Sequence, residues 1–586
     1  MKERNITIDF LKGIAILAVV FYHFGVGLPF GYLGVDIFFV VGGFLLINGL
    51  KHKLEEDKFN YWTYLYRKLI RLWPLVVILS IMSFGVGYFL MLPDDFENLV
   101  ESVIASVIFS NNILQCITTK NYWDVVNFYK PLMHLWYIGI LMQAYIVIPI
   151  FYMLATKIFK KAKNGIAIVT IGLIGISLVL YLLPVFPSAW KFYLLPFRLF
   201  EIVFGGIIVI WKPRANDNVK KAFSIISFSL LLILLCFPKA IISSEFRLLS
   251  VVLASAVFLW ATEGLSYSGI IKHFINIGAG IGEKSYSIYI WHQALIAILF
   301  YSFFPKQNIK SFVVFLCITV ILTLLSYYCI ERPLAKVIEK KKKARFIVIS
   351  TTIISILLGV ASFWVYCHAG VVRNVPELGI VKNDTHRGMH AEYCDRPYGW
   401  DVDFSNDRRK KVLVLGNSFG RDWANILSEW DKNNSLEISY KYYTEGEIEK
   451  DYLKRINKAD IVFFATGPSF DRVPSNIVDI VPQEKLYIVG NKNYGESNGI
   501  VYSHRFGDDY YNQTVVINGD LIYNIESDEE KFGNHYINMM KPVLVDDTHA
   551  RVFTDDNKFI SQDCRHLTQA GARYYARVLS LDWITD

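Results

Sequence analysis

Residues 14–30, IAILAVVFYHFGVGLPF, and residues 33–50, LGVDIFFVVGGFLLINGL, indicate the class of fold to which this chain belongs. A helix that crosses a bilayer needs roughly 17–25 mostly apolar residues, and both stretches meet this requirement. We expect the first to be a permanent span and not a cleaved signal peptide, because it carries the ionisable His23 and leads directly into the second. The chain is therefore predicted to be a polytopic membrane protein.

Apolar runs of similar length recur as far as Tyr366, and beyond it the density of charged residues is ordinary. Over the whole chain 53% of residues are hydrophobic and 19% are charged, whereas about 25% are charged in a soluble domain. The run at 100–114 is short and is followed by polar residues, so we interpret it as interfacial or re-entrant. The predicted fold is an all-α bundle of about eleven spans, at residues 14–30, 33–50, 72–92, 135–154, 166–183, 197–210, 222–237, 248–260, 286–304, 311–330 and 346–366.

Lysines and arginines gather before the first span and after the second, fourth, sixth and tenth spans. Short loops rich in these residues stay in the cytoplasm. Eleven spans with this alternation predict a cytoplasmic N-terminus and place everything after Tyr366 outside. The formal net charge of +8 reflects these loop clusters. They are not arranged as a nucleic-acid-binding stripe, so we expect no nucleic-acid partner.

Ionisable side chains inside predicted spans are costly and usually functional. Lys12 and His23 are eleven residues apart, which puts them on one face of a helix, about 16 Å apart along its axis. Asp36 and His134 also lie in or beside apolar runs. For Lys12 a snorkelling topology anchor is an alternative interpretation, and for His23 a structural hydrogen bond is.

Three further groups of polar residues have helical spacing. Arg198 and Glu201 are three residues apart, as in an intrahelical ion pair. A second group would point into the bundle from one helix face, and it consists of Ser285, Tyr289 and His292. The third is a basic patch at the cytoplasmic end of the third span, made of Arg67, Lys68 and Arg71. The positive-inside rule alone would account for this patch, and a clamp for the phosphates of a nucleotide-bearing donor is the alternative.

Several short motifs follow one another through the membrane region: IDFLK at 8–12 with His23, GVDIFFV at 34–40 with Gly43 and Phe44, RKLIR at 67–71 with Pro74, PLMHLW at 131–136, Arg198 with Glu201 and Gly205, SYSIY at 285–289 with Trp291 and His292, and SYY at 326–328 with IERP at 330–333. In this order they resemble the acyltransferase-3 family of integral membrane O-acyltransferases. The resemblance implies acetyl-CoA as the acyl donor and His23 in the acyl-transfer chemistry. It also implies a membrane site that includes Lys12, Asp36, Arg67, Lys68, Arg71, His134, Arg198, Glu201 and His292.

The chain departs from that family's pattern in two places. Many members have a serine where this chain has Gly42, and one or two glutamates where it has Leu141 and Met142 ahead of Gln143. No role of that carboxylate can be carried over. More weight therefore falls on His23, Lys12 and the basic patch.

Beyond Tyr366, a linker to about residue 410 leads into short β-rich runs at 411–415, 436–443, 460–466 and 485–489. Segments with helical periodicity, such as 422–430, alternate with them and predict an α/β domain with a parallel sheet between two helical layers. The first strand leads into GNSFG at 416–420. Ser418 would lie at the carboxyl edge of the sheet and at a helix N-terminus, a suitable place for a nucleophile.

Near the C-terminus, Asp563 and His566 are three residues apart at the start of a helix. They could contact each other while His566 takes the proton of Ser418. Together with the serine motif they resemble the SGNH hydrolase family, which implies a catalytic triad. Ser418 N–H is one expected oxyanion donor and Gly446 a tentative second. The family's asparagine after the third strand is missing, since residues 465–469 read ATGPS, and Asn491 is an alternative donor. A missing donor typically costs about 10²–10³ in rate, so a slow hydrolase suited to transfer is predicted.

Cys394 and Cys564 both fall in the predicted exported part. A disulfide between them would suit that compartment, and two free thiols are an equally open alternative. We expect no metal cofactor.

The order of the two modules, with an extra span between them, resembles bacterial enzymes that O-acetylate cell-surface polysaccharides. The expected domains are 1–335, a membrane domain of ten spans; 336–410, the eleventh span and a linker; and 411–586, the SGNH-like domain. The expected location is the bacterial plasma membrane, and the expected partners are the bilayer and a surface polysaccharide such as lipopolysaccharide O-antigen, or a lipid-linked glycan. Alternatives are a peptidoglycan O-acetyltransferase, and a transporter or esterase fusion that deacetylates surface glycans.

Overall fold

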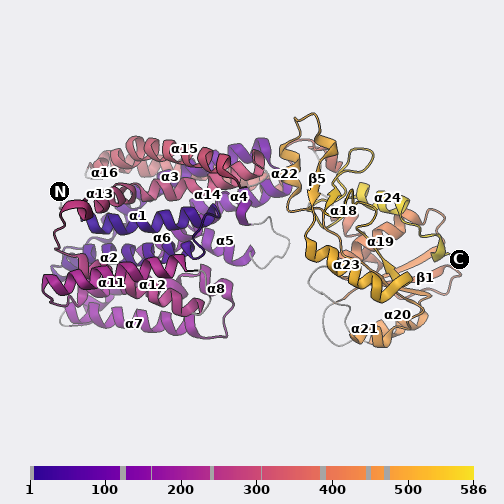
Figure 1. Ribbon diagram of the computed structural model, residues 1–586, viewed down its shortest axis with the longest axis horizontal. Coiled ribbons are helices and arrows are strands. Elements are labelled where there is room, and N and C mark those ends of the chain that lie inside the picture. Colours follow the sequence, from indigo (N-terminus) through magenta and orange to yellow (C-terminus); the bar gives the residue numbers. More distant parts are fainter. Residues whose placement is uncertain are drawn as a thin grey trace. The chain divides into compact units, whose positions relative to one another are not determined.

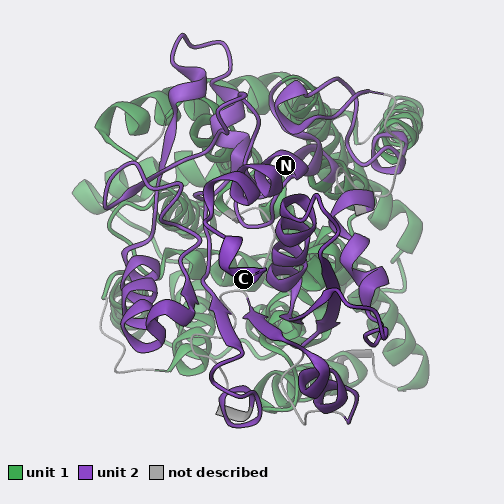
Figure 2. Cartoon of the chain, turned by 90° about the vertical axis from the view of Figure 1, so that its right-hand side faces the viewer, with its two compact units in different colours: residues 1–89, 98–363 green, residues 90–97, 364–586 purple. Residues whose placement is uncertain are grey.

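The computed structural model describes residues 5–118, 127–159, 162–237, 243–304, 307–338, 340–382, 391–443, 450–466 and 475–585. The chain divides into two compact units. Unit 1 contains residues 1–89 and 98–363, and unit 2 contains residues 90–97 and 364–586 (Figure 2).

Unit 1 is helical throughout its described residues (Figure 1). The α-helices of the N-terminal part of the chain are α1 (Ile6–His23), α2 (Gly34–Glu55), α3 (Tyr61–Leu90), α4 (Pro93–Val107), α5 (Asn111–Thr118), α6 (Trp136–Ile158), α7 (Ala162–Leu182), α8 (Ser188–Tyr193), α9 (Leu195–Gly205), α10 (Ile207–Ile210), α11 (Asp217–Cys236), α12 (Ser244–Thr262), α13 (Gly269–Glu283), α14 (Ser285–Ser302), α15 (Ile309–Ser326), α16 (Arg332–Val337) and α17 (Lys341–Cys367).

Among the described residues, ten helical segments are long and apolar enough to cross a membrane. This confirms the polytopic all-α membrane bundle. The predicted span at 286–304 corresponds to α14, which is not one of the ten, because it carries Ser287, His292 and Gln293. All three side chains are buried. The 18 residues of α14 extend about 27 Å, so we count α14 as a bundle helix with a polar interior face.

The predicted bounds of the first span were wrong. The first span was expected at 14–30, but α1 begins at Ile6 and ends at His23. Gly25 and Gly27 follow with φ of +78° and +66°, left-handed conformations that end a right-handed helix. The run at 100–114 is divided between α4 and α5, and Phe109, at φ +58°, separates them.

Glycines allow two helix pairs of the bundle to approach closely. A Cβ added to Gly282 of α13 would lie 1.7 Å from the carbonyl oxygen of Asp9 in α1. A Cβ added to Gly43 of α2 would lie 1.6 Å from the carbonyl oxygen of Ile202 in α9. Small residues at such crossings maximise van der Waals contact where no hydrophobic force drives helices together. The crossing of α1 and α13 matters for function because α1 also carries Lys12 and His23.

Unit 2 is built on a parallel sheet of five strands in the order β2-β1-β3-β4-β6, and its α/β class is the predicted one. The strands of this sheet are β1 (Lys410–Gly416), β2 (Leu436–Tyr442), β3 (Ile461–Ala465), β4 (Leu486–Val489) and β6 (Tyr536–Ile537). A separate antiparallel pair consists of β5 (Thr514–Val516) and β7 (His549–Arg551). The helices are α18 (Ala391–Cys394), α19 (Ser418–Trp430), α20 (Lys450–Lys458), α21 (Ser475–Ile480), α22 (Asn498–Ser503), α23 (Gly519–Phe532) and α24 (Gln569–Val578).

The carboxyl end of β1 positions the serine motif. Residues 412–415 of β1 are fully buried between its neighbours β2 and β3. The strand ends at Gly416, and α19 begins two residues later at Ser418. Asn417 is the N-cap of α19, and its side chain accepts the N–H of Phe419. Trp423, on the next turn of α19, is buried against Phe463 of β3 and fixes the helix on the sheet.

Replacing Gly282 with alanine should destabilise the bundle, because the new methyl group would collide with the backbone of α1. We expect Gly282→Ala to lower the free energy of unfolding by about 1–3 kcal/mol. Gly280→Ala is the matched control on the same helix, since a Cβ there meets nothing within 4 Å. Thermal unfolding of the full chain in detergent would measure both, and equal stability of the two variants would contradict the close approach.

Candidate functional site

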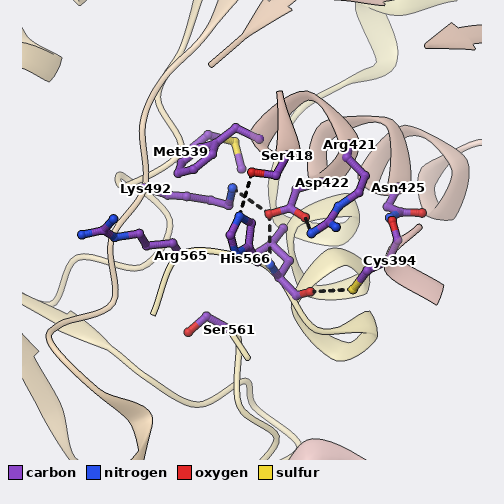
Figure 3. A network of polar contacts seen from close by, with 12 residues as sticks. Cys394, Ser418, Arg421, Asp422, Asn425, Lys492, Met539, Ser561, Arg565 and His566 are labelled. Carbon is purple, nitrogen blue, oxygen red and sulfur yellow. Dashed lines mark hydrogen bonds and ion pairs between the residues drawn. The ribbon is translucent and has the colours of Figure 1, made fainter. Parts of the chain in front are cut away.

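Ser418, His566 and Asp563 meet at the carboxyl edge of the sheet in unit 2. Nε2 of His566 is 2.8 Å from Oγ of Ser418 (Figure 3). Nδ1 of His566 is 2.5 Å from Oδ2 of Asp563. The imidazole of His566 is buried, and the Asp563 carboxyl is about one quarter exposed. The structure thus brings together the three residues that the sequence suggested as a triad.

The carboxyl group of Asp563 is held in its ionised form. Burial by itself would raise its pKa, but hydrogen bonds from the imidazole and N–H of His566 and from the N–H of Arg565 bring the pKa below its usual value. A carboxylate only accepts, so Nδ1 of neutral His566 carries the proton. Its Nε2 then has a lone pair directed at the hydroxyl of Ser418. This arrangement suits a general base acting on a serine nucleophile.

A buried ion pair lies next to this triad, and sequence reasoning missed it. Nζ of Lys492 is 2.9 Å from Oδ2 of Asp422, and each side chain is only 2% exposed. The same Asp422 oxygen accepts the N–H of Leu567, the residue after His566 (Figure 3). The Lys492 ammonium also lies 3.9 Å from the centre of the Phe419 ring, next to Ser418.

Asp422 therefore ties the helix of the nucleophile to the loop of the base. Burial lowers the pKa of Lys492, and the attraction of Asp422 partly offsets this effect. The sequence signal was weak: Asp422 lies four residues after Ser418, and Lys492 lies shortly after the fourth strand.

The oxyanion donors are only partly described. Ser418 is the first residue of α19, where backbone N–H groups have no partner within the helix and favour negative charge. Gly446 and residues 467–469 lie outside the described residues. Asn491 precedes Lys492 in the loop after β4 and is half-buried.

Cys394 and Cys564 are free, buried thiols. Sγ of Cys394 lies 3.5 Å from the carbonyl oxygen of Leu567, and Sγ of Cys564 lies 3.5 Å from Oδ1 of Asn498. Burial raises the pKa of Cys394 to about 12. The disulfide alternative is thus absent from the structure, and each thiol has its own hydrogen-bond partner instead.

In unit 1, three histidines from different elements meet around α14. Nδ1 of His23 is 3.0 Å from Nε2 of His292, and their rings are parallel. The centre of the His134 ring is 5.3 Å from that of His292. His134 and His292 are buried, whereas His23, the last residue of α1, is partly exposed.

Hydrogen bonds assign the tautomers of this cluster. Nδ1 of His292 is 2.6 Å from the carbonyl oxygen of Tyr289. A carbonyl oxygen only accepts, so Nδ1 of His292 carries a proton and Nε2 of the neutral ring has a lone pair. Nδ1 of His23 must then donate to that lone pair. The reactive lone pair of neutral His23 is on Nε2.

A cavity with about 790 Å³ of free space, including its open mouth, leads from cationic residues towards this cluster. Lys12, Lys68 and Arg71 line it. Tyr289 also lines it, and the Tyr289 hydroxyl donates to the carbonyl oxygen of His134 at 2.5 Å. One residue of the cavity lining, Tyr289, therefore contacts the histidine cluster.

The other residues of the predicted membrane site lie apart from the cavity lining. Arg67 is exposed and does not line the cavity. NH1 of Arg198 is 2.9 Å from Oδ1 of Asp36 and 2.7 Å from Oε1 of Glu201, and all three side chains are buried. Asp36 links α2 to α9, so this ion network joins two helices and is more than the intrahelical pair predicted from sequence.

The two positions at which the chain departs from the family pattern face each other in the cavity. Gly42 and Leu141 both line it, and a Cβ on Gly42 would lie 3.4 Å from Cδ1 of Leu141. This is ordinary van der Waals contact, so the cavity wall is apolar here. Among the described residues, no group of three or more His, Cys, Asp or Glu side chains is arranged to hold a metal ion.

Comparison with known proteins identifies the family to which the membrane unit is similar. A family model described as an acyltransferase domain matches residues 5–331. A Staphylococcus aureus protein provisionally named as an O-acetyltransferase is 30% identical over 352 residues, which cover 56% of this chain and 57% of that protein. A peptidoglycan O-acetyltransferase of Listeria monocytogenes is 28% identical over 352 residues, 56% of each chain. The match thus spans little more than half the length of these relatives.

Removing only one partner of the buried ion pair in unit 2 should be costly. Lys492→Met removes the nearer of the two cations that contact buried Asp422, and only NH2 of Arg421, 3.7 Å from Oδ1, is left. We expect a loss of about 3–5 kcal/mol in the free energy of unfolding. In the double variant Asp422→Asn/Lys492→Met neither member of the pair is charged, and the amide oxygen can still accept the N–H of Leu567. Most of the stability should therefore return.

Unfolding of the full chain, followed by tryptophan fluorescence, measures both effects. The matched control is Lys454→Met, which removes an exposed lysine from an ion pair with Asp403 and should leave stability unchanged. If Lys492→Met and Lys454→Met are equally stable, the buried pair does not contribute as argued.

Proposed function

The chain belongs to the family of acyltransferase domains that matches more than half of it, and from this membership we propose that it is a membrane-bound O-acetyltransferase of the cell envelope. It takes acetyl groups from cytoplasmic acetyl-CoA and transfers them to hydroxyl groups of a cell-surface polysaccharide. The observation that carries the proposal is the hydrogen-bonded Ser418–His566–Asp563 set in a chain whose membrane unit is an acyltransferase.

In the proposed topology the N-terminus is cytoplasmic and unit 2 is extracytoplasmic. The support is the distribution of lysine and arginine among the loops, together with α14 as a span in addition to the ten apolar helices. The mouth of the cavity near Lys12, Lys68 and Arg71 then faces the cytoplasm. These cations would hold the phosphates of acetyl-CoA.

The first transfer is assigned to His23. Nε2 of His23 attacks the acetyl carbonyl, the C–S bond breaks, and coenzyme A leaves as a thiolate that takes a proton from solvent. The acetylated imidazole gives up its Nδ1 proton to Nε2 of His292, 3.0 Å away. The carbonyl oxygen of Tyr289, 2.6 Å from Nδ1 of His292, stabilises the resulting cation. His292 then releases its extra proton to solvent, which balances the proton taken up by the thiolate.

The second and third transfers are assigned to unit 2. His566 takes the proton of Ser418 as Oγ attacks the acetyl group that reaches unit 2, and it returns that proton to the group that leaves. An acetyl-serine ester results. A sugar hydroxyl then loses its proton to His566 and attacks the ester, and Ser418 leaves with that proton. The sequence is a ping-pong acyl transfer.

The proposed acceptor of the acetyl group is a class of molecule, the surface glycans. The name of the Listeria relative refers to peptidoglycan, which makes peptidoglycan one acceptor to test beside lipopolysaccharide O-antigen and capsule. A deacetylating esterase would use the same Ser418 chemistry with water as the acceptor. The cavity lined by three cations favours transfer, because an esterase needs no nucleotide-bearing donor.

Loss of either acyl-accepting residue should abolish surface acetylation. We expect Ser418→Ala and His23→Ala to reduce glycan O-acetylation by several orders of magnitude, since each removes an atom that becomes acylated. Mass spectrometry of surface glycans measures this. Ser527→Ala, at an exposed serine of α23, is the control for expression and handling. Wild-type acetylation in either variant, or more acetyl groups after deletion of the gene, would refute the transferase.

The proposed proton transfer to His292 can be tested by itself. In His292→Gln an amide oxygen can accept the Nδ1–H of His23 but cannot take its proton. We expect kcat for release of coenzyme A from acetyl-CoA to fall about 10²-fold or more, with KM unchanged. His273→Gln, at an exposed histidine of α13, should behave as wild type. A His292→Gln enzyme with normal kcat would show that His292 only supports the structure.

A further inference from the structure

Three tyrosines form an aromatic ladder beside the nucleophile of unit 2. We define this ladder as Tyr398, in the 3-10 helix at Arg396–Trp400, with Tyr440 and Tyr442 of β2. The ring centre of Tyr398 is 5.7 Å from that of Tyr440 and 6.5 Å from that of Tyr442. Tyr440 is buried, whereas Tyr398 is 43% exposed and Tyr442 is 46% exposed. The ladder therefore has one anchored ring and two rings that present surface to solvent.

Tyr440, the buried ring of the ladder, contacts the backbone just before Ser418. The hydroxyl of Tyr440 lies 3.1 Å from the carbonyl oxygen of Gly416 and 3.0 Å from that of Asn417. Tyr442, one of the two exposed rings, is paired in register with Gly416 of β1. The two parallel strands are about 4.8 Å apart. Tyr440 and Tyr442 share one face of the sheet, and the Tyr440 ring packs against Gly420 of α19 on that face. The ladder and Ser418 thus belong to the same edge.

A charged pair borders the exposed rings. The guanidinium of Arg421 lies 6.0 Å from the centre of the Tyr398 ring, and its NH1 is 2.9 Å from Oδ1 of Asp395. The Asp395 carboxyl is 49% exposed, so part of it is free to accept hydrogen bonds from a ligand. Arg421 is three residues after Ser418 on α19, one turn from the nucleophile.

We propose that the ladder, with Arg421 and Asp395, is the acceptor subsite and that it binds a pyranose ring of a glycan. An aromatic ring is an apolar plate with a weakly negative face, which complements the C–H groups on one face of a pyranose. The exposed Asp395 carboxylate would accept hydrogen bonds from the ring's hydroxyls, and the largely buried Arg421 would hold that carboxylate in place. A sugar held there lies against the loop that carries the acetyl-serine.

This inference rests on the proposed function for its chemical meaning, because it names the substrate class of the Ser418 site. An acyclic acceptor, such as a polyol phosphate chain, has no ring face to stack on Tyr398 or Tyr442. The ladder therefore predicts a preference for sugar rings over acyclic polyols.

Direct binding tests the subsite without any acyl transfer. The full chain with Ser418→Ala, which cannot turn over, would be titrated by calorimetry with a β-1,4-linked N-acetylglucosamine oligomer. We expect Tyr398→Ala and Tyr442→Ala, each added to Ser418→Ala, to weaken binding roughly tenfold, which corresponds to about 1.4 kcal/mol. Tyr442→Phe should retain binding. Tyr523→Ala is the matched control, because Tyr523 is 70% exposed on α23, a helix that packs on β6 at the opposite edge of the sheet.

A second measurement separates this inference from the proposed function. Enzyme with Ser418 intact would be supplied with p-nitrophenyl acetate, and nitrophenol release and acetyl transfer to the oligomer would be recorded together. We expect the tyrosine variants to raise the KM for the oligomer about tenfold. Tyr523→Ala should leave both this KM and nitrophenol release without the oligomer unchanged.

The subsite would be overturned by tyrosine variants that bind the oligomer as well as the parent does, or by no detectable binding at millimolar oligomer with the ladder intact. Stronger binding of a glycerol phosphate oligomer would also overturn it. Absence of acetyl-serine in the intact enzyme would count against the proposed function alone, because the binding titration does not depend on it.

Discussion

A polar side chain inside a membrane bundle has to find its hydrogen-bond partner within the protein, because hydrocarbon offers none. This constraint organises unit 1. Arg198 is buried and its charge is matched by Asp36 and Glu201, which come from two helices. His292 follows the same rule, because it contacts a backbone carbonyl and His23. Because few partners are available, the direction of each hydrogen bond is determined, and so is the nitrogen that carries each lone pair.

The two histidines assigned to acyl transfer share one arrangement. In His566 and in His23, Nδ1 faces an acceptor and Nε2 has the lone pair, which in His566 is directed at the hydroxyl of Ser418. The acceptors differ in their chemistry. Asp563 is a carboxylate that stays ionised and stabilises the imidazolium form of His566. His292 is an imidazole that can take the proton itself. The first arrangement suits a base that shuttles a proton, and the second suits an imidazole that becomes acylated.

The parallel sheet explains why unit 2 concentrates its polar groups at one edge. The carboxyl ends of neighbouring parallel strands meet there, so Ser418 after β1, Tyr442 at the end of β2 and Lys492 after β4 come together although they are far apart in sequence. The loop that carries His566 is attached to this edge through Asp422, which binds both Lys492 and the N–H of Leu567. A buried ion pair therefore holds the loop of His566 at this edge of the sheet.

The sequence by itself determined the class of each unit and the identity of several site residues. Long apolar runs predict spans because the bilayer thickness sets their length, and the motifs around Ser418 and His566 suggested partners that do lie in contact. The motifs gave residue types but not the directions of their side chains, so they did not predict which residues contact one another. Arg67 was grouped with Lys68 and Arg71 by spacing, but it does not line the cavity. The sequence did not indicate a partner for Asp36, and the folded chain pairs it with Arg198.

Only the tertiary structure decided the pairings between distant elements: His23 with His292, Asp422 with Lys492, and Tyr398 with Tyr442. The physical reason is that short-range patterns depend on the helical repeat and on the alternation of strands, which a sequence displays directly. Contacts between elements depend instead on how side chains fill the space between them. No local pattern encodes that packing, so the residues that only position the reacting groups appear when the folded chain is seen.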